Sequence, residues 1–408
     1  MNLEIFHPSK FCNGSIDIKG SKSISNRLLF LQSIYPSIKI LNESNSEDTV
    51  LMKKGLKSKN NIIDIGHAGT AMRFLTSYFS AQKDREIILT GSKRMQERPI
   101  KILVEALNSL GAEISYEIKE GFPPIKIIGN DLKSKNIFLP ANISSQYISS
   151  LMLLAPILDD GLTIELIGKI TSRPYIKMTL TLLKELGINS VFEKNIIKIE
   201  SKKKIKNISY KIESDWSSAS YFYSIIALCE DGEIVLNNFN KKSLQGDSCL
   251  VKIYDSLGVL SKFEKGRLIL SKKKIDVKNV LNLNLIDSPD IAQTVAVTCF
   301  GLGLNCNLKG LHTLKIKETD RLVALKTEMT KLGAEIIISN DSFHLKNIKK
   351  NIKKKCLLKT YNDHRMAMAF APLSINYSIQ IQDFEVVKKS YPNFWVDIES
   401  IGFQIIKS

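Results

Sequence analysis

The 408-residue sequence has few cysteines and histidines, and their spacing excludes the common metal and disulfide frameworks. The cysteines, Cys12, Cys229, Cys249, Cys299, Cys306 and Cys356, include no Cys-x-x-Cys pair, and the five histidines form no His-Glu-x-x-His pattern. Zinc sites and disulfide scaffolds need such clustered residues. We therefore expect reduced thiols and no bound metal.

Long apolar runs are also missing. The longest weakly polar stretch, 291–304, contains Gln293, Thr294 and Thr298, whereas a membrane-spanning helix needs about 20 mostly apolar residues. The first ten residues have no apolar core of a signal sequence. The sequence predicts a globular cytoplasmic protein of two or three domains.

Acidic residues are too few to balance the basic ones, and the net charge of +17 raises the possibility of nucleic-acid binding. Lysine runs at 202–204, 272–274 and 353–355 lie among isoleucine and asparagine. Aromatic residues that would stack on bases are not interleaved with them. We favour solvated lysines near turns and strand ends, with nucleic-acid binding as the alternative.

Glycine recurs where amphipathic helical patterns end and β-branched residues follow. These patterns lie at 51–55, 103–111, 180–187, 253–258, 325–333 and 396–402. Glycine tolerates the left-handed conformation that ends a helix. Six such endings, mostly about 70 residues apart, indicate six similar units of two helices and several strands.

Each unit also contains an earlier helix that is apolar nearly all round, which predicts an interior position. These inner helices are expected to begin with polar caps at Ser23, Thr70, Ser145, Ser217, Asp290 and Asp363. If they point the same way, each half of the chain presents three positive helix ends to a shared cleft. The halves would meet near 213–215.

The segment Gly20-Ser21-Lys22-Ser23-Ile24-Ser25-Asn26-Arg27 is typical of an anion site at a helix N-terminus, with Ser21 or Ser23 as the cap. It lacks the spacing of a Walker A loop. A plain capped surface helix is the alternative. Similar clusters recur at 66–73, at 144–146 with 172–175, at 317–321 and at 362–365. The many cations at these helix starts, Arg73 among them, favour an anionic ligand.

The segments GSKSISNR, HAGTAMR, MQERPI, SSQY, SRPY, KETDR and NDHRMAM occur in this order. Together they resemble the 5-enolpyruvylshikimate-3-phosphate synthase family, the 3-phosphoshikimate 1-carboxyvinyltransferases, over nearly the whole chain. The resemblance implies an α/β fold, a two-domain inside-out α/β barrel with three βαβαββ-type units in each domain. The expected domains are 19–215, and 1–18 together with 216–408.

The family reaction transfers the enolpyruvyl group of phosphoenolpyruvate to the 5-hydroxyl of shikimate 3-phosphate and releases phosphate. It serves chorismate and aromatic amino-acid biosynthesis and needs no cofactor. The resemblance implies these two small molecules as partners, a monomer, and no nucleic-acid or membrane partner. It also implies competition by glyphosate with phosphoenolpyruvate at Gly69.

The resemblance carries over residue by residue. Shikimate 3-phosphate is expected to contact Lys22, Ser23, Arg27, Ser144, Ser145, Gln146, Ser172, Tyr175, Asp290 and Lys317. Phosphoenolpyruvate is expected to contact Lys22, Gly69, Arg98, Gln146, Arg321, Arg365 and Lys389. Guanidinium groups suit the carboxylate and phosphate of phosphoenolpyruvate because they bind such groups through two parallel bonds.

The reaction requires one group that takes a proton and another that gives one. We expect Asp290 to act as base towards the hydroxyl, Glu318 to protonate the methylene carbon, and Lys22 to stabilise developing charge. The apolar stripe of 322–332 extrapolates back to Glu318, so this side chain should lie at the edge of an apolar helix face, where burial would raise its pKa.

The sequence departs from the family pattern at His67, Phe74 and Thr313, which stand where asparagine, proline and asparagine are common. One related alternative is an enolpyruvyl transferase acting on a UDP-amino sugar. That enzyme needs a loop cysteine near the donor, and no cysteine lies between Cys12 and Cys229.

Overall fold

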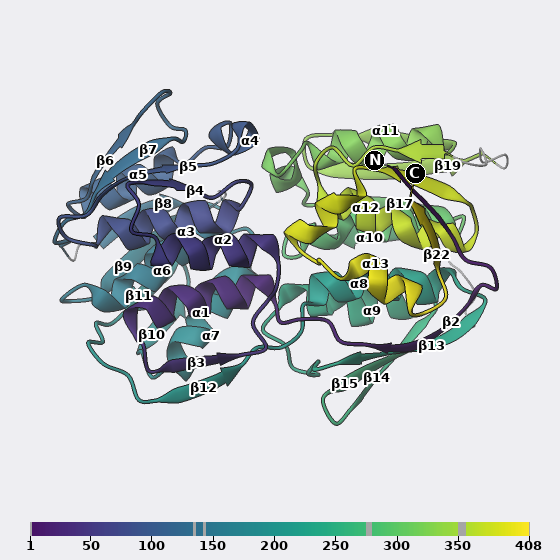
Figure 1. Cartoon of the computed structure of the whole chain (residues 1–408), viewed down its shortest axis with the longest axis horizontal. Helices are drawn as coiled ribbons and strands as arrows, with labels where there is room; N and C mark the ends of the chain where they lie inside the picture. The colour runs from purple at the N-terminus through teal and green to yellow at the C-terminus, as the bar shows by residue number, and fades with distance from the viewer. Residues whose placement is uncertain (1, 134–135, 142–143, 275–279, 350–355, 408) are drawn as a thin grey trace. The chain divides into compact units, whose positions relative to one another are not determined.

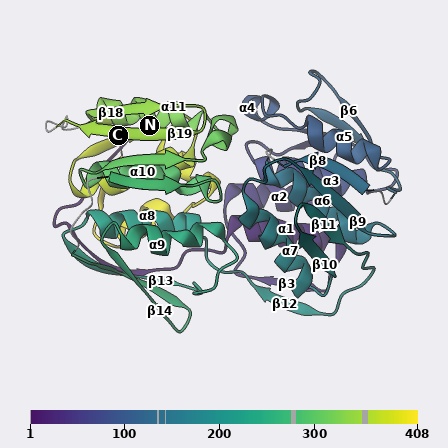
Figure 2. The same cartoon turned by 180° about the vertical axis from the view of Figure 1, so that it is seen from behind.

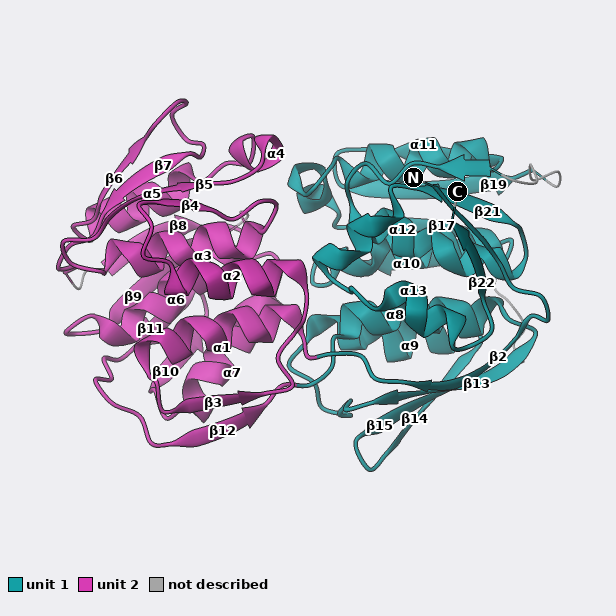
Figure 3. Ribbon diagram, viewed as in Figure 1, with its two compact units in different colours: residues 1–19, 213–408 teal, residues 20–212 magenta. Residues whose placement is uncertain are grey.

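The computed structural model describes residues 2–133, 136–141, 144–274, 280–349 and 356–407. The chain forms two compact units. Unit 1 comprises Met1–Lys19 and Glu213–Ser408, and unit 2 comprises Gly20–Ile212 (Figure 3). Within the described ranges, no helix is long and apolar enough to cross a membrane.

The described residues form six small sheets, three in each unit. In unit 2 the strands pair in the orders β4 (Ile62–Asp64), β5 (Glu86–Thr90), β7 (Ile125–Ile128), β6 (Glu113–Tyr116); β8 (Asn136–Pro140), β9 (Leu162–Ile167), β11 (Ile196–Ile199), β10 (Ser190–Glu193); and β3 (Ile38–Leu41), β12 (Ile208–Lys211). In unit 1 they pair in the orders β2 (Phe11–Ile16), β13 (Asp231–Asn237), β15 (Arg267–Lys272), β14 (Val259–Glu264); β16 (Val280–Asn284), β17 (Asn305–Lys309), β19 (Ser342–Ile348), β18 (Ala334–Ile338); and β20 (Cys356–Leu358), β21 (Ile379–Gln382), β1 (Asn2–Phe6), β22 (Gln404–Lys407).

The five four-stranded sheets share one pattern, in which the first pair of strands is parallel and the other two pairs are antiparallel. Two of the sheets combine strands from distant parts of the chain. β1 pairs with β21 and β22, and β2 pairs with β13. The recurring pattern is the repeat that the glycine positions predict.

Two sets of helices accompany the sheets. The inner helices are α1 (Lys22–Ile34), α3 (Gly69–Ser80) and α6 (Ser145–Leu154) in unit 2, and α8 (Trp216–Leu228), α10 (Ala292–Gly301) and α12 (His364–Phe370) in unit 1. The others are α2 (Glu47–Lys57), α4 (Lys93–Gln96), α5 (Lys101–Ser109), α7 (Arg173–Glu185), α9 (Leu250–Asp255), α11 (Arg321–Lys331) and α13 (Phe394–Glu399).

The inner helices lie in the core, as their apolar composition predicts. Every residue of α8 and α12 is buried. Within unit 1, α10 lies beside both α8 and α12 (Figure 1), and the view from behind shows it between α8 and α11 (Figure 2). α11 is amphipathic instead, with its buried residues on one face.

Five of the six predicted glycine endings are confirmed: Gly111, Gly187, Gly258, Gly333 and Gly402 follow helix ends with positive φ. The sixth is wrong. α2 continues through Gly55 to Lys57, and a Cβ at Gly55 would lie 2.4 Å from Leu75 Cδ1 of α3. This glycine therefore allows two helices to pack closely.

Three of the six inner helices have polar caps, but only Asp363 is the residue that was predicted. Ser144 and Asp215, rather than Ser145 and Ser217, cap α6 and α8. Ser144, Asp215 and Asp363 accept hydrogen bonds from first-turn amides of α6, α8 and α12. The prediction is wrong for α1, α3 and α10, since the N-cap residues Ser21, Ala68 and Ile291, all described, make no side-chain capping bond. α10 starts only at Ala292 because Pro289–Ile291 form a 3-10 turn.

The lysine runs differ from one another. Residues 202–204 are exposed, as expected. Lys272 is half-buried, and its Nζ donates to the carbonyl of Ala227 at 2.5 Å, so this lysine is not simply solvated. The run 353–355 lies outside the described residues.

Candidate functional site

Arg321 is the centre of a buried ion cluster in unit 1. Its side chain is 2% exposed, and its guanidinium donates to three carboxylates. Nε lies 2.7 Å from Asp363 Oδ2, Nη1 lies 2.9 Å from Asp290 Oδ1, and Nη2 lies 2.8 Å from Glu318 Oε2. Burial alone would lower the pKa of Arg321, but the carboxylates outweigh it and raise the pKa above its ordinary value.

The members of this cluster come from the starts of several elements. Arg321 is the first residue of α11, and Asp290 lies in the 3-10 turn before α10. Asp363 caps α12 by accepting from the backbone amide of Arg365 at 2.9 Å. The Arg365 guanidinium donates to Ser217 at the start of α8, with a distance of 3.3 Å. The N-terminal ends of the three inner helices of unit 1 therefore meet.

Glu318 does not occupy the predicted helical position. α11 begins only at Arg321, because Asp320 caps it by accepting from the amides of Leu322 and Val323. The apolar stripe of the helix therefore does not reach Glu318. This side chain is 13% exposed, and its Oε1 lies 3.0 Å from Lys389 Nζ.

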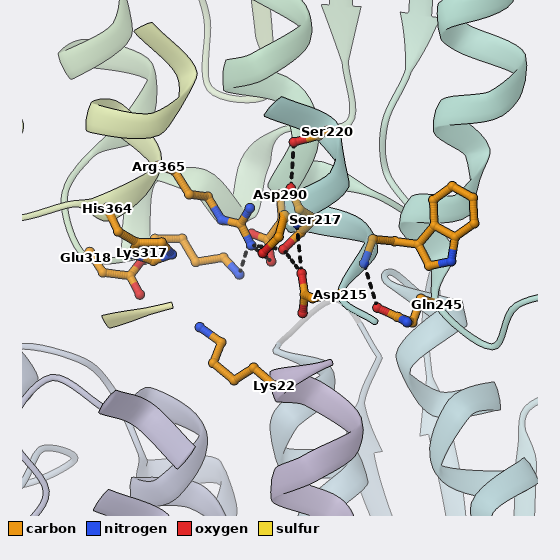
Figure 4. A network of polar contacts seen from close by, with 12 residues as sticks. Lys22, Asp215, Ser217, Ser220, Gln245, Asp290, Lys317, Glu318, His364 and Arg365 are labelled. Carbon is orange, nitrogen blue, oxygen red and sulfur yellow. Dashed lines mark hydrogen bonds and ion pairs between the residues drawn. The ribbon is translucent and has the colours of Figure 1, made fainter. Parts of the chain in front are cut away.

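Asp290 faces three cations, Lys317, Arg321 and Arg365. Lys317 and Arg365 are shown beside it in Figure 4. Its Oδ1 lies 3.4 Å from Lys317 Nζ, and its Oδ2 lies 3.4 Å from the Arg365 guanidinium. Burial alone would raise the pKa of Asp290, but Lys317, Arg365 and Arg321 together hold it well below its usual range. In this arrangement Asp290 neutralises its neighbours and is a weak base.

Asp247 belongs to the same environment and was not predicted. It is buried, and Oδ1 has no hydrogen-bond partner among the described residues. Burial first, and the nearby charge of Asp290 second, raise the pKa of Asp247 to about 7. The surrounding Gly-Asp-Ser segment is typical of a turn, so the sequence contains no signal for this position.

Asp247→Asn is expected to change how stability depends on pH. The pKa of Asp247 rises from 3.8 to about 7 on folding, so the folded chain keeps a proton that the unfolded chain has lost. The ionisable carboxylate therefore destabilises the fold progressively between about pH 4 and pH 7, and fully above that. The free energy of unfolding of the variant, minus that of wild type, should be about 2–4 kcal/mol larger at about pH 8 than at about pH 4, so the variant gains stability relative to wild type as pH rises. Urea titrations at both values test this, and a pH-independent difference would contradict it.

In unit 2, Lys22 is the first residue of α1 and pairs with a carboxylate that was not predicted. Its Nζ lies 3.1 Å from Oδ2 of Asp48, which is 4% exposed and lies in the first turn of α2. A carboxylate in a first helical turn is usually explained by the helix dipole alone. For that reason the pairing with Lys22 was not expected.

Arg27 lies deep in unit 2 and is 2% exposed. Its guanidinium donates to Thr179 Oγ1 at 2.7 Å and to Ser149 Oγ at 2.9 Å, and also to the Ser23 carbonyl. Burial lowers the pKa of Arg27 to about 10. The ring of Phe74 lies 5.5 Å from the guanidinium carbon. Among the described residues, no carboxylate forms an ion pair with Arg27.

Arg98 lies against the start of α3. A Cβ at Gly69, the first residue of that helix, would lie 2.5 Å from Arg98 Nη1. Only glycine lets the guanidinium come so close to the backbone. A methyl group added at Gly69 would therefore force Arg98 to move.

Arg73 is buried in unit 2 and contacts backbone carbonyls of the same unit. It is 3% exposed, and its guanidinium donates to the backbone carbonyls of Pro99 at 2.9 Å and Gly69 at 3.2 Å. These contacts give Arg73 a structural role, and its grouping with the ligand-binding cations stays a prediction. Its role is to hold the segment before α5 against α3.

The remaining predicted residues of unit 2 lie at helix starts. Ser144 caps α6, Ser145 is its first residue, and Gln146 Nε2 donates to Thr70 Oγ1 of α3 at 3.1 Å. Ser172 precedes α7 with a φ of 53°, and its carbonyl accepts from the Tyr175 amide.

Two of the three departures from the family pattern, His67 and Thr313, can be described by their contacts and positions. His67 Nδ1 lies 2.8 Å from Ser92 Oγ, which is the cap of α4. Thr313 lies in the 3-10 turn His312–Ile316. Its Oγ1 is buried and has no hydrogen-bond partner within the described part of the chain.

Comparison with known proteins assigns the chain to a family. The family profile described as EPSP synthase (3-phosphoshikimate 1-carboxyvinyltransferase) matches residues 36–398. A protein named 3-phosphoshikimate 1-carboxyvinyltransferase from Bacteroides fragilis (strain YCH46) is 44% identical over 394 residues, which cover 96% of each chain. A protein of the same name from Buchnera aphidicola subsp. Cinara cedri is 37% identical, and the match covers 97% of this chain and 96% of the relative.

A solved structure of EPSP synthase from Acinetobacter baumannii has a TM-score of 0.77 and 20% sequence identity, with both chains covered completely. This likeness confirms the expected α/β fold. From the profile match and the identities to its relatives, we conclude that the chain belongs to the EPSP synthase family.

Proposed function

We propose that the polar clusters of the two units serve the reaction of the family. The chain transfers the enolpyruvyl group of phosphoenolpyruvate to the 5-hydroxyl of shikimate 3-phosphate, giving 5-enolpyruvylshikimate 3-phosphate and phosphate. The observation that carries the site proposal is the convergence of the segments 317–321 and 362–365 on the ion cluster around Arg321.

For phosphoenolpyruvate, the proposed ligands in unit 1 are Arg321, Arg365 and Lys389. All three cations are at most 6% exposed and pair with carboxylates. A donor that carries a carboxylate and a phosphate could replace part of these pairings without leaving a buried charge unpaired. In unit 2, the proposed ligands are Lys22, Gly69, Arg98 and Gln146.

For shikimate 3-phosphate, the proposed ligands are Lys22, Ser23, Arg27, Ser144, Ser145, Gln146, Ser172 and Tyr175 of unit 2, with Asp290 and Lys317 of unit 1. Arg27 supports this assignment because it is a buried cation without an ion-pair partner in the described residues. A phosphate group would supply the missing negative charge. The side-chain oxygens of serine and the helix starts add hydrogen-bond donors.

The chemistry requires formation of a C–O bond between the 5-hydroxyl and C2 of the donor, while C3 gains a proton. Asp290 takes the hydroxyl proton, Glu318 protonates C3, and Lys22 stabilises the charge that develops. Phosphate then leaves as C3 gives a proton back to the Glu318 carboxylate. Because Lys317, Arg365 and Arg321 depress the pKa of Asp290, substrate anions that take over these cations would raise that pKa and make Asp290 a stronger base.

We also propose that the protein acts as a monomer in the cytoplasm, without nucleic-acid or membrane partners. No disulfide joins the six cysteines, all of which lie in the described residues, which agrees with a reducing compartment. The exposed lysines at 202–204 have no aromatic neighbours in sequence that could stack on bases.

A phosphate-release assay with alternative acceptors tests the proposed function. Release that requires both phosphoenolpyruvate and shikimate 3-phosphate is expected, with none when a UDP-amino sugar replaces the acceptor. Mass spectrometry of the product should show the enolpyruvyl ether. If phosphate is released from phosphoenolpyruvate with the UDP-amino sugar as acceptor but not with shikimate 3-phosphate, the proposal is overturned in favour of the related transferase.

Gly69→Ala is expected to weaken donor binding. The added methyl carbon would lie 2.5 Å from Arg98 Nη1 and would displace the guanidinium. The KM for phosphoenolpyruvate should therefore rise about tenfold, as for loss of a charged hydrogen bond. By the family resemblance, the inhibition constant of glyphosate should rise further. Steady-state kinetics with both ligands test this.

Gly55→Ala is the matched control for that variant. Its methyl would meet Leu75 at 2.4 Å and no cation, so it should lower stability and leave the KM for phosphoenolpyruvate unchanged. If Gly69→Ala behaves like Gly55→Ala, Arg98 does not bind the donor.

A further inference from the structure

Glu328 is a fully buried carboxylate for which the proposed reaction has no role. It lies on α11, two turns after Arg321, and is 0% exposed. Oε1 accepts from the Tyr361 hydroxyl at 2.5 Å, and Oε2 accepts from the Lys359 backbone amide at 3.1 Å. Lys331 Nζ lies within 2.8 Å of both oxygens. A buried charge is retained only with such a complete set of partners.

The segment that Glu328 holds has an unusual backbone. Tyr361 and Asn362 both have left-handed conformations, with φ values of 55° and 54°. This conformation is unfavourable for residues with a side chain, so neighbouring contacts must hold it. Glu328 supplies two of these contacts, one to the side chain of Tyr361 and one to the backbone of Lys359.

The same segment ends at Asp363, which is 0% exposed. Asp363 accepts from Arg321 Nε at 2.7 Å and caps α12 at the amide of Arg365. α11 therefore holds the segment 359–363 at two places, through Arg321 at its start and through Glu328 two turns later. A segment fixed at one place could pivot, whereas two attachments fix the direction of Asp363.

We infer that Glu328 is a positioning residue that orients Arg321 and Arg365 for the phosphoenolpyruvate donor. It acts through Tyr361 and Asp363 and does not touch the substrate itself. The inference rests on the proposed role of the Arg321 cluster in donor binding. If Glu328 only stabilised the fold, its loss would affect unfolding but not the affinity for one substrate in particular.

Tyr361→Phe and Glu328→Gln test this inference. The first removes one hydroxyl, and the second keeps the shape but removes the charge. Each should raise the KM for phosphoenolpyruvate about 5- to 20-fold, the size expected for one hydrogen bond to a charged group, and change the KM for shikimate 3-phosphate less than about twofold. The double variant should show little more than the larger single effect, because both changes break the same contact.

Tyr223→Phe is the matched control. It removes a hydroxyl that bonds Ser261 at 2.9 Å in the same unit, away from the Arg321 cluster. Its free energy of unfolding should fall as in Tyr361→Phe, with the KM for phosphoenolpyruvate unchanged. An unchanged KM for phosphoenolpyruvate in both Tyr361→Phe and Glu328→Gln would overturn the inference, and so would an equal rise in Tyr223→Phe.

Arg365→Lys separates this inference from the proposed function. If Arg365→Lys raises the KM for phosphoenolpyruvate while Glu328→Gln and Tyr361→Phe do not, the cluster binds the donor and the positioning role alone is wrong. If Arg365→Lys also leaves that KM unchanged, the proposed donor site is wrong, and the positioning role falls with it.

Discussion

Arg321→Lys is expected to lose about 10²- to 10³-fold in kcat/KM for phosphoenolpyruvate, the effect of breaking a buried charge network of this kind. Arg321 donates hydrogen bonds to Asp363, Asp290 and Glu318 from three different nitrogens. A lysine has one ammonium group and cannot reach three carboxylates arranged around a planar fork. Asp363, which is fully buried, would keep its charge without its main partner.

Steady-state kinetics and urea unfolding of the same preparation test this prediction. The free energy of unfolding should also fall, by about 2–4 kcal/mol. Arg267→Lys on the exposed end of β15 is a control that should change neither quantity. A variant that is less stable but retains its kcat/KM for phosphoenolpyruvate would show that the cluster has only a structural role.

Glu318→Gln is expected to bind both substrates and to lose at least about 10²-fold in kcat, as for removal of a general acid. The amide oxygen can still accept from Arg321, which now lies 2.8 Å away. The amide cannot deliver a proton to the donor carbon. In deuterated water, the variant should also stop incorporating deuterium into the methylene group of phosphoenolpyruvate.

Glu335→Gln makes the same substitution at an exposed position on β18 and should leave kcat unchanged. Near-normal turnover in Glu318→Gln would assign the proton transfer to Asp290 or Lys22. Loss of turnover with normal deuterium incorporation would instead place Glu318 in a later step, such as the loss of phosphate.

The repeated fold could be predicted because its signals are local. A glycine with positive φ after a helix leaves a mark in the sequence itself, as at Gly187 and Gly333. At Gly55 the same pattern predicted a helix end that does not exist, because this glycine is required by close packing against Leu75 of another helix. The sequence pattern alone cannot distinguish a glycine that ends a helix from one that allows two helices to pack closely.

The site could be predicted in part. Arg321 and Arg365 belong to recognisable segments, but Asp48, Asp247 and Glu328 do not. The contact between Glu328 and Tyr361 spans 33 positions of the chain, and buried carboxylates of this kind become meaningful only when their partners are known. The resemblance therefore identified the residues proposed to contact ligands, but not the residues that hold them in place.

The position of β1 has a consequence for synthesis of the chain. β1 leaves the ribosome before every other described strand, yet its two neighbours, β21 and β22, leave after all the others. Unit 2 is continuous and has all its strands once Ile212 has emerged, so it can fold during translation. The edges of β1 stay unpaired until β21 and β22 have been made, which leaves a strand open to wrong pairing. Removal of β22 would therefore block completion of unit 1, although this strand lies far in sequence from Arg321.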